Sequence, residues 1–225
     1  MNRYIRNENM LSPEENLSLR SFRVAVVGCG GLGGYLIEML ARLGIGHLTM
    51  IDGDVFEPSN LNRQLLSRPG NMGRAKAAEA KRHVSKINPD VHAVAHQLYL
   101  TADNAVDLLR GHDLVCDALD NVSARLCIQD AADSLGIPLV YAAIAGWYAQ
   151  VATIFPGDRL LDKLYPEGTG KGAETYFGNP SFTPALAASL QVAEVLKVLL
   201  NKEGILRNKL LVANTLSHEY QVVVL

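Results

Sequence analysis

The sequence predicts an α/β fold with a Rossmann-like, mostly parallel sheet, helices on both faces, and antiparallel closing strands at the C-terminal end. The first 145 residues alternate short β-branched runs with helical patterns. A glycine-rich loop follows the first of these runs, and two strand-like runs end the chain. Such alternation favours a parallel sheet, because consecutive parallel strands need a crossover that is usually a helix.

The first half of the chain, residues 23–145, is expected to form the nucleotide-binding half. Arg23–Val27 predicts the first strand, and leucines then recur at helical spacing until Gly44 ends the helix. His47–Ile51 predicts the second strand, and the next helix stops before Pro89, since a residue before proline disfavours helical angles. Further strands are predicted at 91–99, 114–118 and 139–143, with helices at 104–110 and 122–135.

Residues 146–225 have a different pattern. After a strand at 150–155, residues 156–180 are rich in glycine and proline without periodicity, which is typical of a functional lid or a disordered segment. Thr183 and Pro184 predict an N-cap and a first helical residue for a helix at 184–200. This helix is apolar except for a narrow polar stripe, so it should be buried on two sides. The stripe consists of Gln191, Glu194, Lys197 and Asn201. Residues 209–213 and 220–225 predict the closing strands.

Composition limits the class of protein. With 225 residues, 48% of them hydrophobic, the chain fits one domain with a substantial core. A net charge of −2 and a pI of about 6.3 argue against a nucleic-acid partner. The start carries no apolar signal-like run, and no uncharged stretch approaches the roughly 18 residues of a membrane span. We therefore expect a cytoplasmic protein without a membrane association.

The glycine loop predicts a phosphate-binding turn. Gly28, Gly30 and Gly33 allow a tight turn, close approach of the backbone to phosphate oxygens, and packing of the helix against the strand. Asp52, at the end of the second strand, can accept hydrogen bonds from ribose hydroxyls. These features alone suit NAD as well as ATP.

Residues further along favour transfer at phosphorus. Arg63, Lys76 and Asp120 supply two cations and a candidate Mg²⁺ ligand, which a dehydrogenase does not need. Asp120 follows the fourth strand at the carboxyl edge, where ligands of such folds bind. Asp120 could also be the N-cap of the helix that follows it.

From residue 3 to about residue 216 the chain resembles the ThiF/MoeB/HesA family, bacterial relatives of the ubiquitin-activating enzymes. The motifs that carry the resemblance are GCGGLG at 28–33, the DxD of Asp52 and Asp54, NLNRQ at 60–64, GRAK at 73–76, and DALDN at 117–121 followed by Arg125. The family adenylates the C-terminal glycine carboxylate of a ubiquitin-like sulfur carrier protein. The resemblance implies the same ATP- and Mg²⁺-dependent reaction here, as in thiamine or molybdopterin synthesis, on a carrier ending in Gly-Gly.

The resemblance also implies roles for individual residues. Asp52 would bind ribose, Asn60, Arg63 and Gln64 would contact phosphates, Lys76 would neutralise transition-state charge, and Asp120 would hold Mg²⁺. The expected nucleotide-binding set is Gly28, Gly30, Gly31, Gly33, Asp52, Asp54, Asn60, Gln64 and Asn121. Residues 3–6 match the family's RYxR, in which the second arginine reaches the neighbouring subunit's ATP. Arg6 is therefore a candidate catalytic residue acting in trans, and a homodimer is expected.

Two departures from the family narrow the activity. Many relatives bind zinc through two CxxC pairs, whereas residues 158–162 here contain no cysteine and the second pair is absent. Zinc is not expected. The stretch Thr175-Tyr176-Phe177 replaces a cysteine that some relatives use for a covalent link to the carrier. These departures leave adenylation without covalent transfer.

The predicted organisation is one adenylating domain, with an N-terminal arm at 1–20, the nucleotide-binding half at 23–145, and a carrier-binding and dimerisation half at 146–225 that includes the crossover loop at 156–180. Three alternatives stay open: adenylation of a non-protein carboxylate such as threonylcarbamoyladenosine in tRNA, an NAD-binding oxidoreductase, and a non-catalytic scaffold.

Overall fold

The computed structural model describes residues 3–166 and 174–225 and contains an eight-stranded sheet in the order β3-β2-β1-β4-β5-β6-β7-β8. The strands are β1 Arg23–Val27, β2 His47–Ile51, β3 His92–His96, β4 Leu114–Asp117, β5 Leu139–Ala145, β6 Tyr148–Ile154, β7 Lys209–Asn214 and β8 Glu219–Val224. The helices are α1 Pro13–Ser18, α2 Gly31–Leu43, α3 Lys76–Ile87, α4 Ala105–Leu109, α5 Val122–Leu135, α6 Leu160–Leu164, α7 Glu174–Phe177 and α8 Phe182–Leu199. Short 3-10 turns lie at Ile5–Asn7, Leu19–Ser21, Pro58–Asn60 and Pro69–Asn71.

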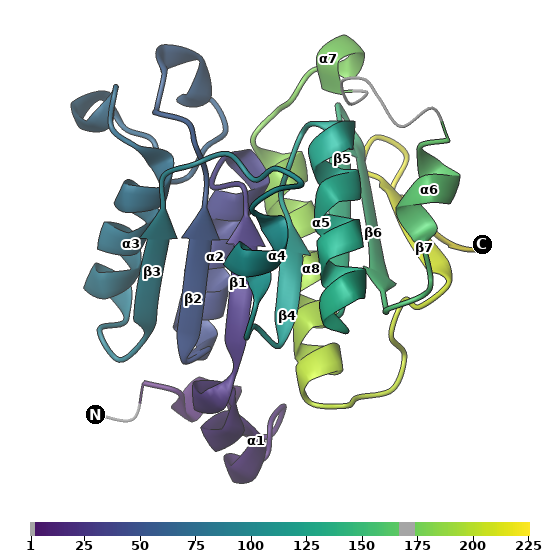
Figure 1. Ribbon diagram of the computed structural model, residues 1–225, viewed down its shortest axis with the longest axis horizontal. Coiled ribbons are helices and arrows are strands. Elements are labelled where there is room, and N and C mark those ends of the chain that lie inside the picture. Colours follow the sequence, from purple (N-terminus) through teal and green to yellow (C-terminus); the bar gives the residue numbers. More distant parts are fainter. Residues whose placement is uncertain (1–2, 167–173) are drawn as a thin grey trace.

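The sheet is parallel from β3 to β5 and antiparallel from β5 to β8. The strand order reverses direction at β1, where β2 lies on one side and β4 on the other, and the carboxyl ends of all five parallel strands meet at the upper edge in Figure 1. Ligands of open α/β sheets bind outside the carboxyl ends at such a switch point. The predicted fold class, with its antiparallel closing strands, is confirmed.

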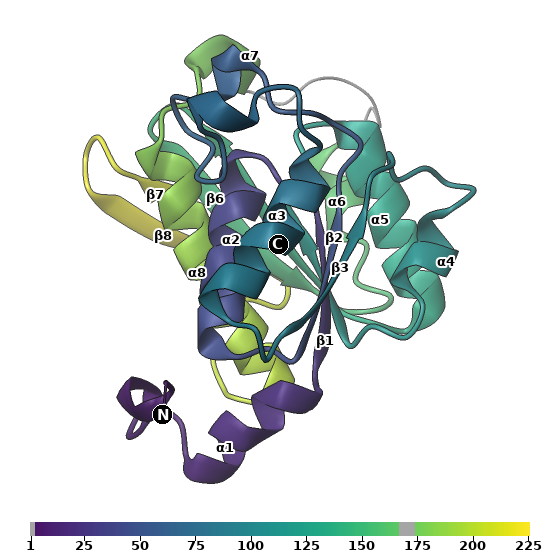
Figure 2. The same cartoon turned by 90° about the vertical axis from the view of Figure 1, so that its left-hand side faces the viewer.

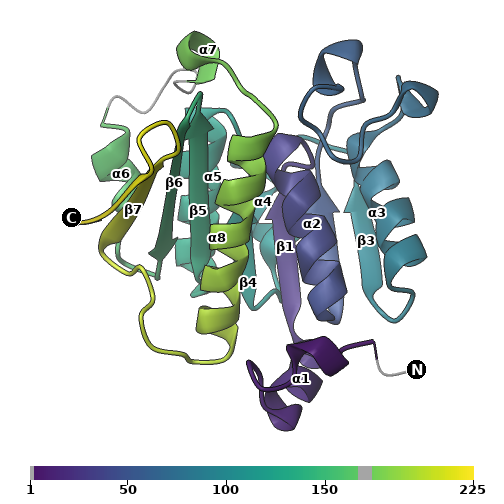
Figure 3. The same cartoon turned by 180° about the vertical axis from the view of Figure 1, so that it is seen from behind.

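Helices cover both faces of the sheet, and each layer has its own apolar core. Figure 2 shows the sheet nearly on edge, with α2, α3 and α8 on one face and α4, α5 and α6 on the other. Figure 3 shows α8 lying beside α2 on the first face. Buried side chains of β1 alternate between the two cores, Val24 and Val26 in one and Ala25 and Val27 in the other. A strand buried on both faces explains the continuous apolar run.

The helix α8 differs from the prediction at its start. It begins at Phe182 with Ser181 as N-cap, so Thr183 is not the cap. The Thr183 hydroxyl instead donates to the Gly146 carbonyl at 2.7 Å. Gln191 and Glu194 of the polar stripe are fully buried, and both are hydrogen-bonded: Gln191 Nε2 donates to two carbonyls of the sheet, and Glu194 accepts from Thr153. The helix is long and apolar enough to cross a membrane, but half of it is buried in the fold, as in a core helix.

The segment 156–180, expected to be a functional lid or a disordered segment, contains two short helices, α6 and α7, and residues 167–173 of it lie outside the described residues. The start of this segment is held by ion pairs. Arg159 pairs with Asp130 and Asp162, and Arg207 pairs with Asp158. Ion pairs therefore hold residues 158–162, the stretch that takes the place of the first CxxC pair of the family that the sequence resembles.

The N-terminal arm lies at the amino-terminal ends of the strands, opposite the edge where ligands bind (Figure 1). Arg3 Nη1 donates to the Ile87 carbonyl and to Asn88 Oδ1, at 3.1 and 2.6 Å, where α3 ends. The ring of Tyr4 lies over Gly44, so that a Cβ there would come within 2.6 Å of it. These contacts dock the arm against the ends of α2 and α3.

Candidate functional site

The glycine loop joins β1 to α2 and forms the floor of a cavity. Gly28 has φ +98°, and a Cβ there would lie 2.4 Å from the Ala118 carbonyl oxygen. A Cβ on Gly33 would lie 1.9 Å from the Gly28 oxygen, so α2 packs directly on the loop. Gly30 is the N-cap of α2, and Gly31 is the first helical residue. The free N–H groups at this helix end can face an anion, as the glycine spacing predicted.

Asp52 ties the loop to the turn after β2. Its Oδ2 accepts from the Cys29 backbone N–H at 2.7 Å, and its Oδ1 accepts from the Asp54 N–H at 2.8 Å. Burial raises the pKa of Asp52, and the two donated bonds reverse only part of that rise. Each carboxylate oxygen keeps a further lone pair, so Asp52 can still accept from ribose hydroxyls.

Asp54 is held between a lysine and a tyrosine. Lys76 Nζ lies 2.9 Å from Asp54 Oδ2, and the Tyr99 hydroxyl donates to Asp54 Oδ1 at 2.6 Å. Burial raises the pKa of Asp54, but the hydrogen bonds from Lys76 and Tyr99 outweigh that effect and the net pKa is lowered. Asp54 is therefore ionised at neutral pH, and the Lys76 ammonium is held at the cavity wall.

The NLNRQ segment contributes two residues to the cavity and one behind it. Arg63 Nη1 donates to the Ser59 carbonyl and to Asn62 Oδ1, both at 2.9 Å, and pairs with no carboxylate among the described residues. Gln64 Nε2 faces the loop, within 3.4 Å of where a Gly30 Cβ would be. Asn60 does not line the cavity, because its buried Oδ1 accepts from the Glu57 N–H and closes the local turn.

The DALDN segment brings Asp120 and Asn121 to the same edge. Asp120 is exposed and lines the cavity. The N-cap of α5 is Asn121, whose Oδ1 accepts from the Ala124 N–H at 3.1 Å, so the capping role considered for Asp120 belongs to its neighbour. Capping by Asn121 leaves the Asp120 carboxylate available to a ligand.

These residues enclose a cavity of about 420 Å³ over the carboxyl ends of β1, β2 and β4. It holds the predicted Gly28, Gly30, Gly31, Asp52, Asp54, Arg63, Gln64, Lys76, Asp120 and Asn121. Two amide oxygens on its wall, Gln64 Oε1 and Asn179 Oδ1, are buried with no hydrogen bond among the described residues. Buried acceptors without partners are rare in folded proteins, and a ligand with hydroxyl or amino donors would satisfy them.

A buried ionic network supports the cavity from below. Arg125 Nε lies 3.5 Å from Asp117 Oδ2 and donates to the Leu119 carbonyl at 3.1 Å. Its Nη1 donates to the Tyr165 hydroxyl at 2.6 Å, and Tyr165 in turn lies 2.8 Å from the hydroxyl of Tyr141. Burial raises the pKa of Asp117 to about 6 despite the nearby guanidinium. The network fixes the backbone that carries Asp120 and joins it to the end of α6.

Arg6 and the cysteines lie outside this arrangement. Arg6 is exposed on the arm at the opposite edge of the sheet and is not among the residues that line the cavity of its own chain. Cys29 and Cys116 are buried, Cys127 is half-buried, and all three are free. Burial raises the pKa of Cys29 and Cys116 thiols, which keeps them protonated and weakly nucleophilic.

Sequence reasoning missed Tyr99 and Asn179 as cavity residues. Tyr99 was assigned to the end of a strand, but β3 ends at His96 and Tyr99 crosses above the turn at Gly53. Asn179 follows α7 at the cavity wall, and its carbonyl accepts from Asn62 Nδ2 at 3.2 Å. No local signal in the sequence marks either residue, since Tyr99 lies 45 residues beyond Asp54 in the chain.

A doubly wound sheet with a glycine loop at its switch point defines the Rossmann-like class of nucleotide-binding proteins. Within that class, residues 2–225 match the model of the ThiF family. The chain belongs to the ThiF family.

The sequence relatives agree in activity class. The chain is 33% identical to a SAMP-activating enzyme E1 of Haloferax volcanii, over 99% of this chain and 84% of that protein. It is 36% identical to a sulfur carrier protein adenylyltransferase of Thermus thermophilus, over 94% of this chain and 81% of that protein. It is 34% identical to a sulfur carrier protein ThiS adenylyltransferase of Bacillus subtilis, over 89% and 62%. The predicted family and enzyme class, an ATP-dependent adenylyltransferase, are confirmed.

Solved structures share the fold. Escherichia coli MccB with ATP superimposes with a TM-score of 0.81 at 22% identity, over 99% of this chain and 70% of that one. The tRNA N6-threonylcarbamoyladenosine dehydratase TcdA of E. coli gives a TM-score of 0.76 at 26% identity, over 88% and 94%.

Proposed function

We propose that this chain adenylates the C-terminal glycine carboxylate of a ubiquitin-like sulfur carrier protein ending in Gly-Gly, releasing pyrophosphate. One observation carries the proposal: Lys76 and Arg63 lie on the wall of one cavity with the glycine loop and Asp120. A cavity with fixed cations beside a phosphate-binding loop suits charge redistribution at phosphorus, which hydride transfer to NAD does not involve.

The reaction begins with nucleotide binding over the loop. Phosphates lie at the N-terminus of α2, with Gln64 Nε2 as a donor, and Asp52 accepts from the ribose hydroxyls. The carrier's carboxylate is already ionised at neutral pH, so no general base is needed. One carboxylate oxygen attacks the α-phosphorus, the bond from phosphorus to the bridging oxygen of pyrophosphate breaks, and the electron pair leaves with pyrophosphate.

Lys76 and Arg63 stabilise the charge that builds up on the phosphate oxygens during this transfer. Lys76 is 7% exposed, so its ammonium acts in a partly desolvated site where electrostatic effects are stronger than in water. Arg63 donates only to neutral oxygens in the described structure, which leaves its full charge for a phosphate. Catalysis is mostly positioning and charge stabilisation.

Asp120 is the residue we assign to Mg²⁺. Its exposed carboxylate supplies the hard oxygen that this ion prefers, and Mg²⁺ commonly takes one or two carboxylates, water and substrate phosphates. No group of three or more metal-ligating side chains occurs among the described residues, which fits an ion held mainly by the nucleotide. When bound, Mg²⁺ would neutralise negative charge on the phosphates.

The position of Arg6 bears on the quaternary structure. Its arm is docked away from the cavity of its own chain, so Arg6 can act only on a neighbouring subunit, and we propose a cytoplasmic homodimer in which it does.

The experiment is carrier-dependent ATP-pyrophosphate exchange with the purified chain and ubiquitin-like carriers ending in Gly-Gly. Exchange that appears with a carrier and disappears when its last glycine is removed supports the proposal. Exchange that proceeds with transfer RNA carrying threonylcarbamoyladenosine, and with no carrier, would favour the tRNA reaction. The likeness to TcdA is the reason for testing transfer RNA, and the balanced charge of this chain argues against a transfer RNA substrate.

A further inference from the structure

Tyr99 is held above the DxD turn by three contacts. Its backbone carbonyl accepts from Asn104 Nδ2 at 3.0 Å, and its hydroxyl donates to Asp54 Oδ1 at 2.6 Å. Its ring lies so close to Gly53 that a Cβ there would come within 2.8 Å of three ring carbons. Since Gly53 does not need its glycine for a positive φ, the close approach of this ring explains why no side chain is present at that position.

The Tyr99 hydrogen bond holds the side chain of Asp54, which the backbone hydrogen bonds of the turn do not restrain. The Asp54 N–H donates to Asp52, and the Asp54 carbonyl accepts from the Lys76 N–H at 2.9 Å. The backbone of the turn is thus fixed at both sides. The Asp54 side chain, however, is 49% exposed and would be free to rotate into solvent without a second partner.

We propose that Tyr99 is a positioning residue that locks the Asp54 carboxylate and, through it, the Lys76 ammonium in the orientation needed at the reacting phosphate. The chain of contacts runs from the Tyr99 hydroxyl to Asp54 Oδ1, and from Asp54 Oδ2 to Lys76 Nζ. The inference rests on the proposed role of Lys76 in adenylation and adds a residue that the family motifs do not include.

The position of Tyr99 suits this role better than a purely structural one. Tyr99 is 66% exposed and lines the cavity, so it adds little to the core. The hydrogen bond to the carboxylate also raises the pKa of the Tyr99 phenol, which keeps the hydroxyl protonated and able to donate at all physiological pH values.

The first test replaces the hydroxyl alone. Tyr99→Phe should lower kcat of carrier-dependent exchange about tenfold, as for loss of a hydrogen bond to a charged group, and leave KM for ATP within about twofold. Tyr220→Phe, which removes the hydroxyl of an exposed tyrosine on the edge strand β8, is the matched control and should change neither value. An unchanged kcat in Tyr99→Phe, or a change in KM alone, would overturn the proposal.

The second test asks whether Tyr99 acts through Asp54. In an Asp54→Asn background, Tyr99→Phe should lower kcat by less than about twofold further, because the pair forms one unit. A full additional tenfold loss in that background would show that Tyr99 acts on the nucleotide directly and would also overturn the proposal.

A third measurement needs no enzymatic activity. The tyrosinate absorbance of the wild type minus that of Tyr99→Phe gives the titration of this one phenol. Replacing Asp54 by Asn should lower its midpoint, and an unchanged midpoint means that the contact is absent in solution. If the wild type shows no exchange, the proposed function fails while this titration still decides the contact.

Discussion

The replacement of Lys76 tests the electrostatic basis of the site. Lys76 is 7% exposed and lies 2.9 Å from Asp54, so its charge is fixed at the cavity wall before substrate arrives. Removing one preorganised donor of this kind costs about 10² to 10³ in kcat, or about 2.7 to 4 kcal/mol of transition-state stabilisation. Lys76→Ala should therefore reduce carrier-dependent exchange by that factor.

The same change should have little effect on folding. The partner left behind, Asp54, has a side chain that is 49% exposed and can be hydrated, so the lost ion pair costs about 1 kcal/mol or less. Lys76→Met keeps the packed aliphatic stem and should lose as much activity as Lys76→Ala. Urea unfolding of both variants separates the loss of catalysis from any loss of stability.

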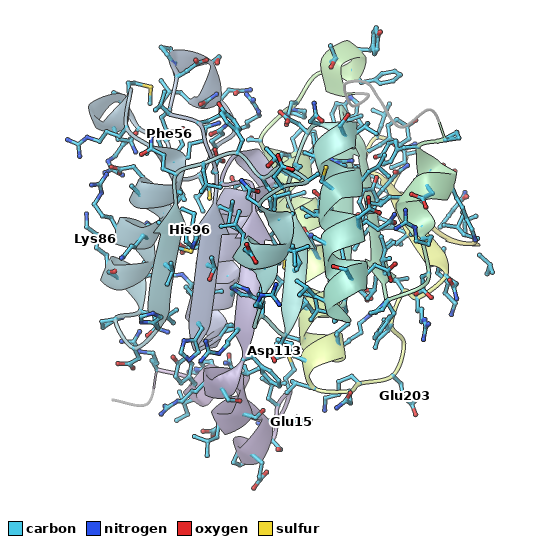
Figure 4. The ribbon with its side chains drawn as sticks, in the orientation of Figure 1. Glu15, Phe56, Lys86, His96, Asp113 and Glu203 are labelled. Carbon is cyan, nitrogen blue, oxygen red and sulfur yellow. The ribbon has the colours of Figure 1, made fainter. Side chains whose placement is uncertain are left out.

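Lys86 provides the matched control on the same helix. It is exposed near the end of α3 and points away from the fold in Figure 4. Lys86→Ala should leave exchange within about twofold of the wild type, as expected for a solvated surface charge. Exchange in Lys76→Ala within about fivefold of the control would refute the assignment of Lys76 to the transition state.

Further predictions concern the metal, the dimer, the cysteines and the pH dependence of stability. Asp120→Ala should abolish most exchange at any Mg²⁺ concentration, as measured by incorporation of labelled pyrophosphate into ATP. Mixing Arg6→Ala with Asp120→Ala chains should restore activity through one hybrid site per heterodimer; a monomer in sedimentation, or no rescue, counts against it. Replacing all three cysteines should leave adenylate formation within about tenfold, with no stoichiometric zinc in elemental analysis. The pKa of Asp117 in the folded protein lies above its ordinary value, so the fold favours the protonated carboxyl. The resulting contribution to the free energy of unfolding is fully present below about pH 4 and is lost as the pH rises through about 6. The loss should be about 3 kcal/mol, read as the difference between wild type and Asp117→Asn in urea unfolding.

Most of the fold was predictable because its signals are local. The strand at Arg23–Val27, the strand at His47–Ile51 and the helix at Val122–Leu135 have the predicted bounds. Their ends are set by nearby residues, such as Gly136, whose left-handed conformation ends the last of these. The start of α8 was predicted wrongly because a tertiary contact decided it. Thr183 looks like an N-cap in sequence, but its hydroxyl is used by the Gly146 carbonyl on a neighbouring hairpin.

The residues that line the cavity were predictable where they come shortly after a strand end, and not where their position depends on a neighbour distant in sequence. The glycine loop and Asp52 follow a strand directly, Asp120 comes shortly after β4 ends at Asp117, and the parallel sheet brings strand ends together. Asn60 lies within the same motif as Gln64, yet its carboxamide is used to close its own turn. The spacing of the motif does not predict that Asn60 closes a turn while Gln64 lines the cavity.

Tyr99 shows the opposite case, a residue outside every motif that the fold brings to the cavity. It lies 45 residues from Asp54 in the chain, and the two meet only because β2 and β3 are parallel neighbours whose carboxyl ends lead into the same cavity. The pairing of His47 with His92 and of Ile51 with His96 sets that register. A shift of register by one residue would reverse the face to which each side chain of β3 points. The position of Lys76, which we propose to be catalytic, therefore depends on apolar packing along β3, and substitutions there should alter kcat without touching a motif residue.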